Sequence, residues 1–116
     1  MTLKPPFFDL SQAREISGEK DMLRQLVLTF IESLDTELAN AQQAFQTHDQ
    51  PAMSQSLHAL KGFLPLFCQP ELAQMVIALY AECRRQELSK TQARFQTLEP
   101  ALLELQKEAK AWLGAL

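Results

Sequence analysis

Glycine is scarce in this chain, and the β-branched residues that favour strands are sparse. Only 3 of the 116 residues are glycine. Alanine, leucine, glutamine and glutamate dominate instead, and their side chains lose little conformational freedom in a helix. The length suits a single domain, and a hydrophobic fraction of 47% is enough to fill one core. The composition therefore predicts an all-α domain.

Long apolar runs and clusters of one charge are also missing. No run of roughly 18 apolar residues occurs, so we expect no membrane insertion. The formal net charge is −3, from 11 basic and 14 acidic residues, and no Lys/Arg stripe indicates binding to nucleic acid. The first residues lack the apolar segment of a secretory signal. We therefore expect a cytoplasmic protein.

Several chemical signatures of enzymes are absent. The two cysteines, Cys68 and Cys83, do not form a C-x-x-C pair or show another metal-ligand spacing. We expect them to be reduced thiols that pack as small hydrophobic side chains. There is no glycine-rich phosphate loop, and no pair of carboxylates suggests a general acid and base. We expect this chain to bind no cofactor and no metal by itself.

Apolar residues recur every three or four positions through most of the chain, which predicts amphipathic helices. Pro5 and Pro6 block a helix at the start, so residues 1–8 are interpreted as a leader and 9–116 as one helical bundle domain. Short connections imply that sequential long helices are antiparallel. The predicted architecture is an up-down-up-down four-helix bundle with a short extra N-terminal helix. The expected helices cover residues 9–16, 19–47, 51–67, 70–86 and 89–114.

Two possible helix starts resemble capping boxes, and one proline lies inside an expected helix. Asp9 with Gln12, and Ser89 with Gln92, have the spacing at which a side chain caps the first backbone N–H groups. Pro100 should kink or restart the last helix, because a proline removes one backbone hydrogen bond and clashes with the preceding turn.

The position of His58 on the third helix is the main functional indication. A helical projection places the apolar side chains of this helix roughly 180° to 260° away from His58. The residues that flank His58 are polar or small, and Ser54, Gln55 and Pro65 are among them. The apolar residues are Met53, Leu57, Leu60, Leu64 and Phe67. We therefore expect His58 to point into solvent from the middle of a helix, which leaves either a surface histidine without a role or a reactive one.

Lys61 and Gly62 favour the reactive interpretation. Lys61 follows His58 by one helical turn, so its ammonium can reach the space above the imidazole. A cation there favours a neutral, nucleophilic imidazole and neutralises phosphoryl oxygens after attack. Gly62 costs about 1 kcal/mol relative to alanine in a helix, and it removes side-chain volume beside His58. The three residues together predict a docking site for a phosphoryl donor.

The segment Leu57-His58-Ala59-Leu60-Lys61-Gly62 resembles the H-x-L-K-G signature of histidine-containing phosphotransfer domains. The resemblance extends over about residues 7–112, and it includes the opening Phe8-Asp9-Leu10-Ser11-Gln12-Ala13 and the following Ser17-Gly18-Glu19. Leu72, Met75 and Leu79 lie where the family's next helix has core residues.

This resemblance implies a phosphocarrier and not an enzyme. His58 would accept a phosphoryl group from the aspartate of a receiver domain and pass it to another receiver aspartate. Lys61 would stabilise the phosphoryl charge, and Gly62 would give steric access. The partners would be receiver domains of response regulators or hybrid sensor histidine kinases, and the receiver would supply Mg²⁺ and most of the catalysis.

Several positions depart from the family pattern. The residues after Gly62 are bulky where family members have small ones, and Pro65 should bend the helix there. Cys68 stands in place of a common glycine, and Tyr80 in place of a Gln or Glu near the ring. The predicted partner-docking residues are Ser54, Gln55, Pro65 and Tyr80.

Two alternatives remain open. One is a bundle of the same fold that docks a response regulator or another partner without efficient phosphotransfer, which the bulky residues would favour. The other is a dimerising helix pair of a histidine kinase. The four long helices and Ala59 after His58 argue against that pair, so we expect a monomer.

Overall fold

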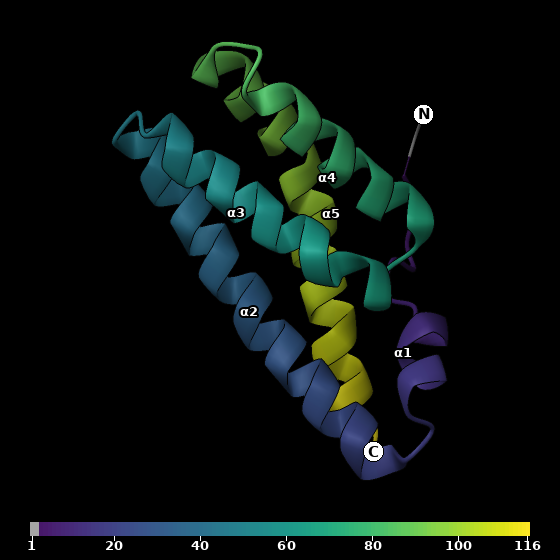
Figure 1. Cartoon of the computed structure of the whole chain (residues 1–116). Coiled ribbons are helices and arrows are strands. Elements are labelled where there is room, and N and C mark those ends of the chain that lie inside the picture. Colours follow the sequence, from purple (N-terminus) through teal and green to yellow (C-terminus); the bar gives the residue numbers. More distant parts are fainter. Residues whose placement is uncertain (1–2) are drawn as a thin grey trace.

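The computed structural model describes residues 3–116, and its elements follow one another in antiparallel order (Figure 1). Residues 1 and 2 of the predicted leader lie outside the described residues. A 3₁₀ turn, Leu64–Leu66, follows the third helix. The helices are α1 (Ser11–Ile16), α2 (Lys20–Gln46), α3 (Gln50–Phe63), α4 (Pro70–Cys83) and α5 (Leu88–Gly114).

Each long helix packs against two others, which closes a four-helix bundle. Helix α2 contacts α3 and α5, and α4 contacts the same two helices. The short α1 lies at the end of the bundle where α2 begins, and the C-terminus is nearby (Figure 1). The predicted all-α bundle with a short N-terminal helix is therefore confirmed. Within residues 3–116, none of the helices is both long and apolar enough to cross a membrane.

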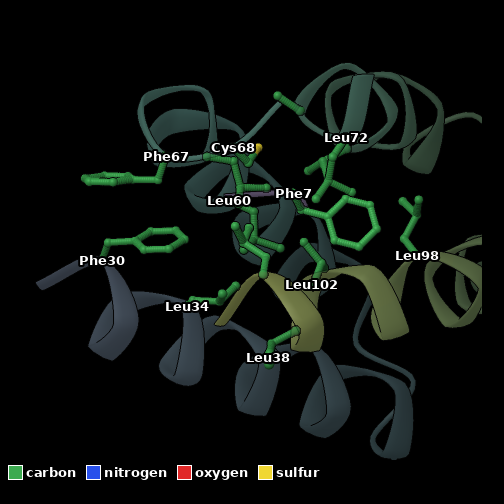
Figure 2. Close-up of a cluster of buried hydrophobic side chains, with 14 of the residues drawn as sticks. Phe7, Phe30, Leu34, Leu38, Leu60, Phe67, Cys68, Leu72, Leu98 and Leu102 are labelled. Atoms are coloured by element: carbon green, nitrogen blue, oxygen red, sulfur yellow. The ribbon is translucent and has the colours of Figure 1, made fainter. Parts of the chain in front are cut away.

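One apolar stripe from each helix fills the core between them (Figure 2). Val27, Leu34 and Leu60 are fully buried, so α2 and α3 meet through closely packed side chains. The rings of Phe30 and Phe67 stack with centroids 4.4 Å apart at 17°. This stack attaches the chain just after α3 to the middle of α2.

Helix α3 ends earlier than its apolar pattern predicts. We expected it to continue to Phe67 with a bend at Pro65, but it ends at Phe63. Pro65 has no N–H to donate to the carbonyl of Lys61, and its ring crowds that carbonyl. The chain therefore tightens into the 3₁₀ turn, although Leu64 is still fully buried.

Helix α3 begins with an effective cap, but two predicted caps are wrong. The Asp49 side chain accepts a hydrogen bond from the Ala52 N–H at 3.0 Å. Helix α1 has Leu10 as its N-cap residue, and Asp9 accepts instead from the N–H and hydroxyl of Ser11. Those hydrogen bonds lower the pKa of the Asp9 carboxyl below its usual value.

The second wrong cap, at Ser89, and the expectation for Pro100 both concern α5. This helix begins at Leu88 with Glu87 as its N-cap residue, so Ser89 lies inside the helix and does not cap it. We expected Pro100 to kink or restart the last helix; it does not restart it, because α5 is continuous from Leu88 to Gly114.

Part of the predicted leader packs on the bundle. Phe7 is buried at 4% exposure, and its ring lies among residues of α4 and α5, including Leu72 and Leu98 (Figure 2). The backbone N–H groups of Phe7 and Phe8 donate to Glu108 Oε1 at 2.7 and 2.8 Å. The boundary that we drew after residue 8 therefore does not coincide with an edge of the packed core.

Candidate functional site

His58 is exposed in the middle of α3, as its position on the helical projection predicted. The opposite side of α3 carries Met53, Leu57 and Leu60, which are all fully buried. Burial of these side chains fixes the rotation of the helix, because turning it would expose apolar surface to water. The imidazole is therefore directed away from the core by the packing of its own helix.

Tyr80 of α4 lies beside the imidazole. The two ring centroids are 5.4 Å apart, and the ring planes are inclined by 49°. Tyr80 is half-buried, so its ring forms part of the wall next to His58. The structure thus brings together the histidine and the tyrosine that replaces the Gln or Glu of the family pattern.

The ammonium group of Lys61 contacts the same tyrosine. Its Nζ atom lies over the Tyr80 ring, 4.7 Å from the centroid. A cation at this distance is attracted by the negative face of the ring. We expected the Lys61 ammonium to reach the space above the imidazole. The structure shows it in contact with the Tyr80 ring, which connects Lys61 of α3 with α4.

Gly62 has open space where a side chain would extend. A Cβ atom built at this position would meet nothing within 4 Å, apart from the helix's own backbone and adjacent residues. Gly62 is also helical without a positive φ, so the backbone does not require glycine. Neither packing nor conformation within the described chain accounts for this residue, and its effect is to leave the surface beside His58 uncovered.

A groove of about 650 Å³ runs along this side of α3 and α4. Gln50 is one of the lining residues, and its Nε2 donates to the carbonyls of Cys83 and Gln86, which ties the start of α3 to the end of α4. No carboxylate is among the lining residues. The groove is lined by Gln50, Pro51, Ser54, Gln55, His58, Tyr80 and Arg84.

Three of the four predicted docking residues, Ser54, Gln55 and Tyr80, line the groove. Gln55 is exposed in the groove, whereas Ser54 is only 7% exposed and accepts a hydrogen bond from Arg84 Nε. Pro65 is exposed but does not line the groove, because α3 ends before it. The assignment of these four residues to partner docking stays a prediction.

Arg84 lines the groove, although the sequence analysis did not assign it to the site. It follows Tyr80 by four positions, the spacing at which two side chains share one face of a helix. Its Cζ atom lies 5.9 Å from the Tyr80 centroid. Once Tyr80 had been chosen, the same spacing could have identified Arg84.

A family model described as the Hpt domain matches residues 25–112. The chain belongs to the Hpt domain family. The match includes His58, Lys61, Gly62, Tyr80 and Arg84. No curated protein and no solved structure matches the chain significantly.

Hpt domains are phosphocarrier modules of two-component phosphorelays, and they interact with receiver domains. Membership therefore assigns this helical bundle to phosphorelay signal transduction. Hpt domains in general are carrier modules and not catalysts in their own right.

Proposed function

We propose that this Hpt domain accepts a phosphoryl group on His58 from a receiver-domain aspartate and passes it to another receiver aspartate. The observation that carries the proposal is the exposed imidazole of His58 in the middle of α3, on the same helix as Lys61 and the uncovered Gly62. The chain has 2 histidines, and the other, His48, is in the turn between α2 and α3.

The transfer step needs only a nucleophile from this chain. The lone pair of one imidazole nitrogen attacks phosphorus and forms an N–P bond. The bond between phosphorus and the aspartyl oxygen breaks, and its electron pair leaves with the carboxylate. The other ring nitrogen keeps its proton, so the ring is cationic until that proton is lost to water. Transfer to the second receiver runs the same exchange in reverse.

Lys61 and Gly62 have complementary roles in this proposal. The Lys61 ammonium would neutralise part of the charge on the phosphoryl oxygens, since a charged donor bonds strongly to such oxygens. Gly62 would allow the receiver surface to reach the imidazole without meeting a side chain. The receiver would supply Mg²⁺ and most of the catalysis, and this chain would need no cofactor of its own.

The docking contacts would come from the groove. Gln55 and Tyr80 lie next to His58 along it, and both are accessible from outside the bundle. Pro65 would contact the receiver only if the interface extends past the end of α3. We expect the protein to act in the cytoplasm, where receiver domains are available.

We also propose that the protein acts as a monomer. Four helices of one chain already close the bundle around a core, so a second chain is not needed to cover α2 or α5. A histidine-kinase helix pair would need that second chain. A sedimentation mass of twice the chain mass of 13.2 kDa would contradict the monomer.

The test is phosphotransfer from a radiolabelled hybrid kinase or phosphorylated receiver, with His58→Gln and His48→Gln compared. We expect label that is acid-labile and alkali-stable on the wild type and on His48→Gln, and none on His58→Gln. His48→Gln is a matched control because it removes the other exposed histidine. Label retained on His58→Gln would contradict the proposal.

A second candidate is a bundle that docks receivers without transfer. Phe63 and Leu66 are half-buried bulky residues one and four positions after Gly62, in a segment where the family pattern has small residues. Measurable receiver binding without label on His58 would favour this candidate, and stoichiometric label on His58 would exclude it.

A further inference from the structure

Arg84 lies at the end of α4 and lines the same groove as His58. A cation at a helix C-terminus is stabilised there by the helix dipole, and this ordinary effect applies equally to Arg84 and to its neighbour Arg85. The two arginines differ in their surroundings, because Arg85 does not line the groove.

Two contacts hold the Arg84 side chain across the groove. Its Nε donates to the Ser54 hydroxyl at 3.4 Å, and its Cζ lies 5.9 Å from the Tyr80 centroid. Ser54 is buried on α3, so it is a fixed acceptor. The Nη atoms form no hydrogen bond with residues 3–116, and they keep the paired donors with which arginine binds phosphate.

The charge of Arg84 is not neutralised within the described chain. The ion pair found among residues 3–116 joins Arg94 to Glu82, and no carboxylate lines the groove. Lys61 and Arg84 both lie over the Tyr80 ring, which is itself next to His58. The site therefore has two cations, while a phosphoryl group near neutral pH carries between one and two negative charges.

We propose that Arg84 is a second cation for the phosphoryl group, and that its Nη donors bind the phosphoryl oxygens on His58 and prolong the lifetime of the phosphohistidine. The inference rests on the proposed function only in taking His58 as the phosphoacceptor. Binding to these oxygens stabilises the phosphorylated state, since their negative charge decreases when the phosphoryl group departs to water in a loose transition state.

The experiment uses phosphoramidate as the donor, because it needs no receiver. The His58 nitrogen forms an N–P bond while the P–N bond of phosphoramidate breaks, and the nitrogen that leaves departs as ammonia. After the donor is removed, the half-life of the phosphohistidine is followed by ³¹P NMR. The variants are Arg84→Gln, Arg84→Lys and the matched control Arg85→Gln.

We expect Arg84→Gln to shorten the half-life about three- to tenfold, the size expected for one charge-assisted hydrogen bond. Arg84→Lys should recover part of the loss, and Arg85→Gln should match the wild type. Thermal unfolding of each variant shows whether the substitution also changes the stability of the fold. Recovery of the half-life by Arg84→Lys indicates that the positive charge matters, since a purely structural role would not be rescued by lysine. A half-life for Arg84→Gln equal to that of Arg85→Gln, or longer, would overturn the inference.

The outcomes also separate this inference from the proposed function. If phosphoramidate labels His58 but no receiver exchanges with it, the relay function fails while the comparison of half-lives stands. If receivers do exchange and Arg84→Gln has no effect, only the role of Arg84 fails. If neither phosphoramidate nor a receiver labels His58, both the relay function and the role of Arg84 are overturned.

Discussion

The Nζ atom of Lys61 lies 4.7 Å from the centroid of the Tyr80 ring, although the two residues belong to different helices. The same ring is 5.4 Å from the His58 ring. Tyr80 therefore connects the proposed nucleophile with the proposed charge-stabilising lysine. The contact restricts a flexible side chain that would otherwise lose conformational entropy when it meets the phosphoryl group.

The first prediction separates the ring of Tyr80 from its hydroxyl. Tyr80→Phe keeps an aromatic face for Lys61 and should change the rate of transfer to His58 by no more than about twofold. Tyr80→Leu removes that face and should slow transfer about threefold or more, since a cation–π contact contributes about 0.5–1 kcal/mol. Single-turnover transfer from a phosphorylated receiver measures both rates. Equal rates for the leucine and phenylalanine variants would show that the aromatic contact has no role.

The second prediction concerns Gly62. Gly62→Ala should raise the free energy of unfolding by about 0.5–1 kcal/mol, because alanine favours a helix and its methyl group meets nothing in the protein. The same methyl group faces the receiver, so transfer should become about tenfold slower or worse. Urea unfolding and single-turnover transfer give the two readouts.

Gly114→Ala is the matched control for Gly62→Ala. A Cβ at Gly114 also meets nothing within 4 Å, but this residue ends α5 instead of neighbouring His58. It should leave transfer unchanged. If Gly62→Ala also leaves transfer unchanged, the glycine has no role in access to the imidazole.

Periodicity was sufficient to predict the bundle and the exposure of His58. The apolar residues of α2 and α3 recur at helical spacing, and the buried side chains Met53, Leu57 and Leu60 fix the outward direction of His58. These features depend on one helix at a time, so the local pattern contains them. The membership of the family follows from the same region of the chain.

Contacts between side chains of two different helices or segments could not be predicted from the periodicity of one helix. The hydrogen bond from Arg84 to the buried Ser54 joins the end of α4 to α3. The burial of Phe7 depends on the packing of α4 and α5 around it and on Glu108, about one hundred positions later in the chain. Such contacts leave no periodic signal in the sequence, and neither of them was predicted.

The third prediction is a pH dependence that arises from Cys68. Burial raises the pKa of the Cys68 thiol from 9.0 to about 12 and outweighs a backbone hydrogen bond from Ala73, which acts in the opposite direction. The folded protein therefore keeps a proton that the unfolded chain loses above pH 9. Stability is complete below that pH and should fall by about 1 kcal/mol between pH 8 and 10.

Urea unfolding at several pH values, with wild type and Cys68→Ala compared, measures this contribution. The alanine variant should lack this part of the decrease, whatever its stability at pH 8. A thiol reagent should also modify Cys68 in the native protein only as fast as the protein opens, since the side chain is 3% exposed. Parallel pH curves for the two proteins would contradict the prediction.

The fourth prediction tests whether the residues before Asp9 belong to the folded domain. Glu108 Oε1 accepts hydrogen bonds from the backbone N–H groups of Phe7 and Phe8 and thereby attaches the N-terminal segment to α5. Glu108→Ala leaves two N–H groups without this acceptor and should lower the free energy of unfolding by about 1.5–3 kcal/mol. Glu108→Gln keeps an acceptor oxygen without the charge and should lower it less.

Glu104→Ala is the control, because Glu104 lies one turn earlier on α5 and forms no hydrogen bond from its side chain within residues 3–116. It should change stability by less than about 0.5 kcal/mol. Phe7→Ala should lower stability by about 3–5 kcal/mol, since it empties a buried ring site between α4 and α5. If Glu108→Ala and Phe7→Ala both unfold like the control, residues 1–8 form a separate leader. If both are destabilised while His58 still accepts phosphate, the segment is part of the bundle and stabilises it at a distance from the site.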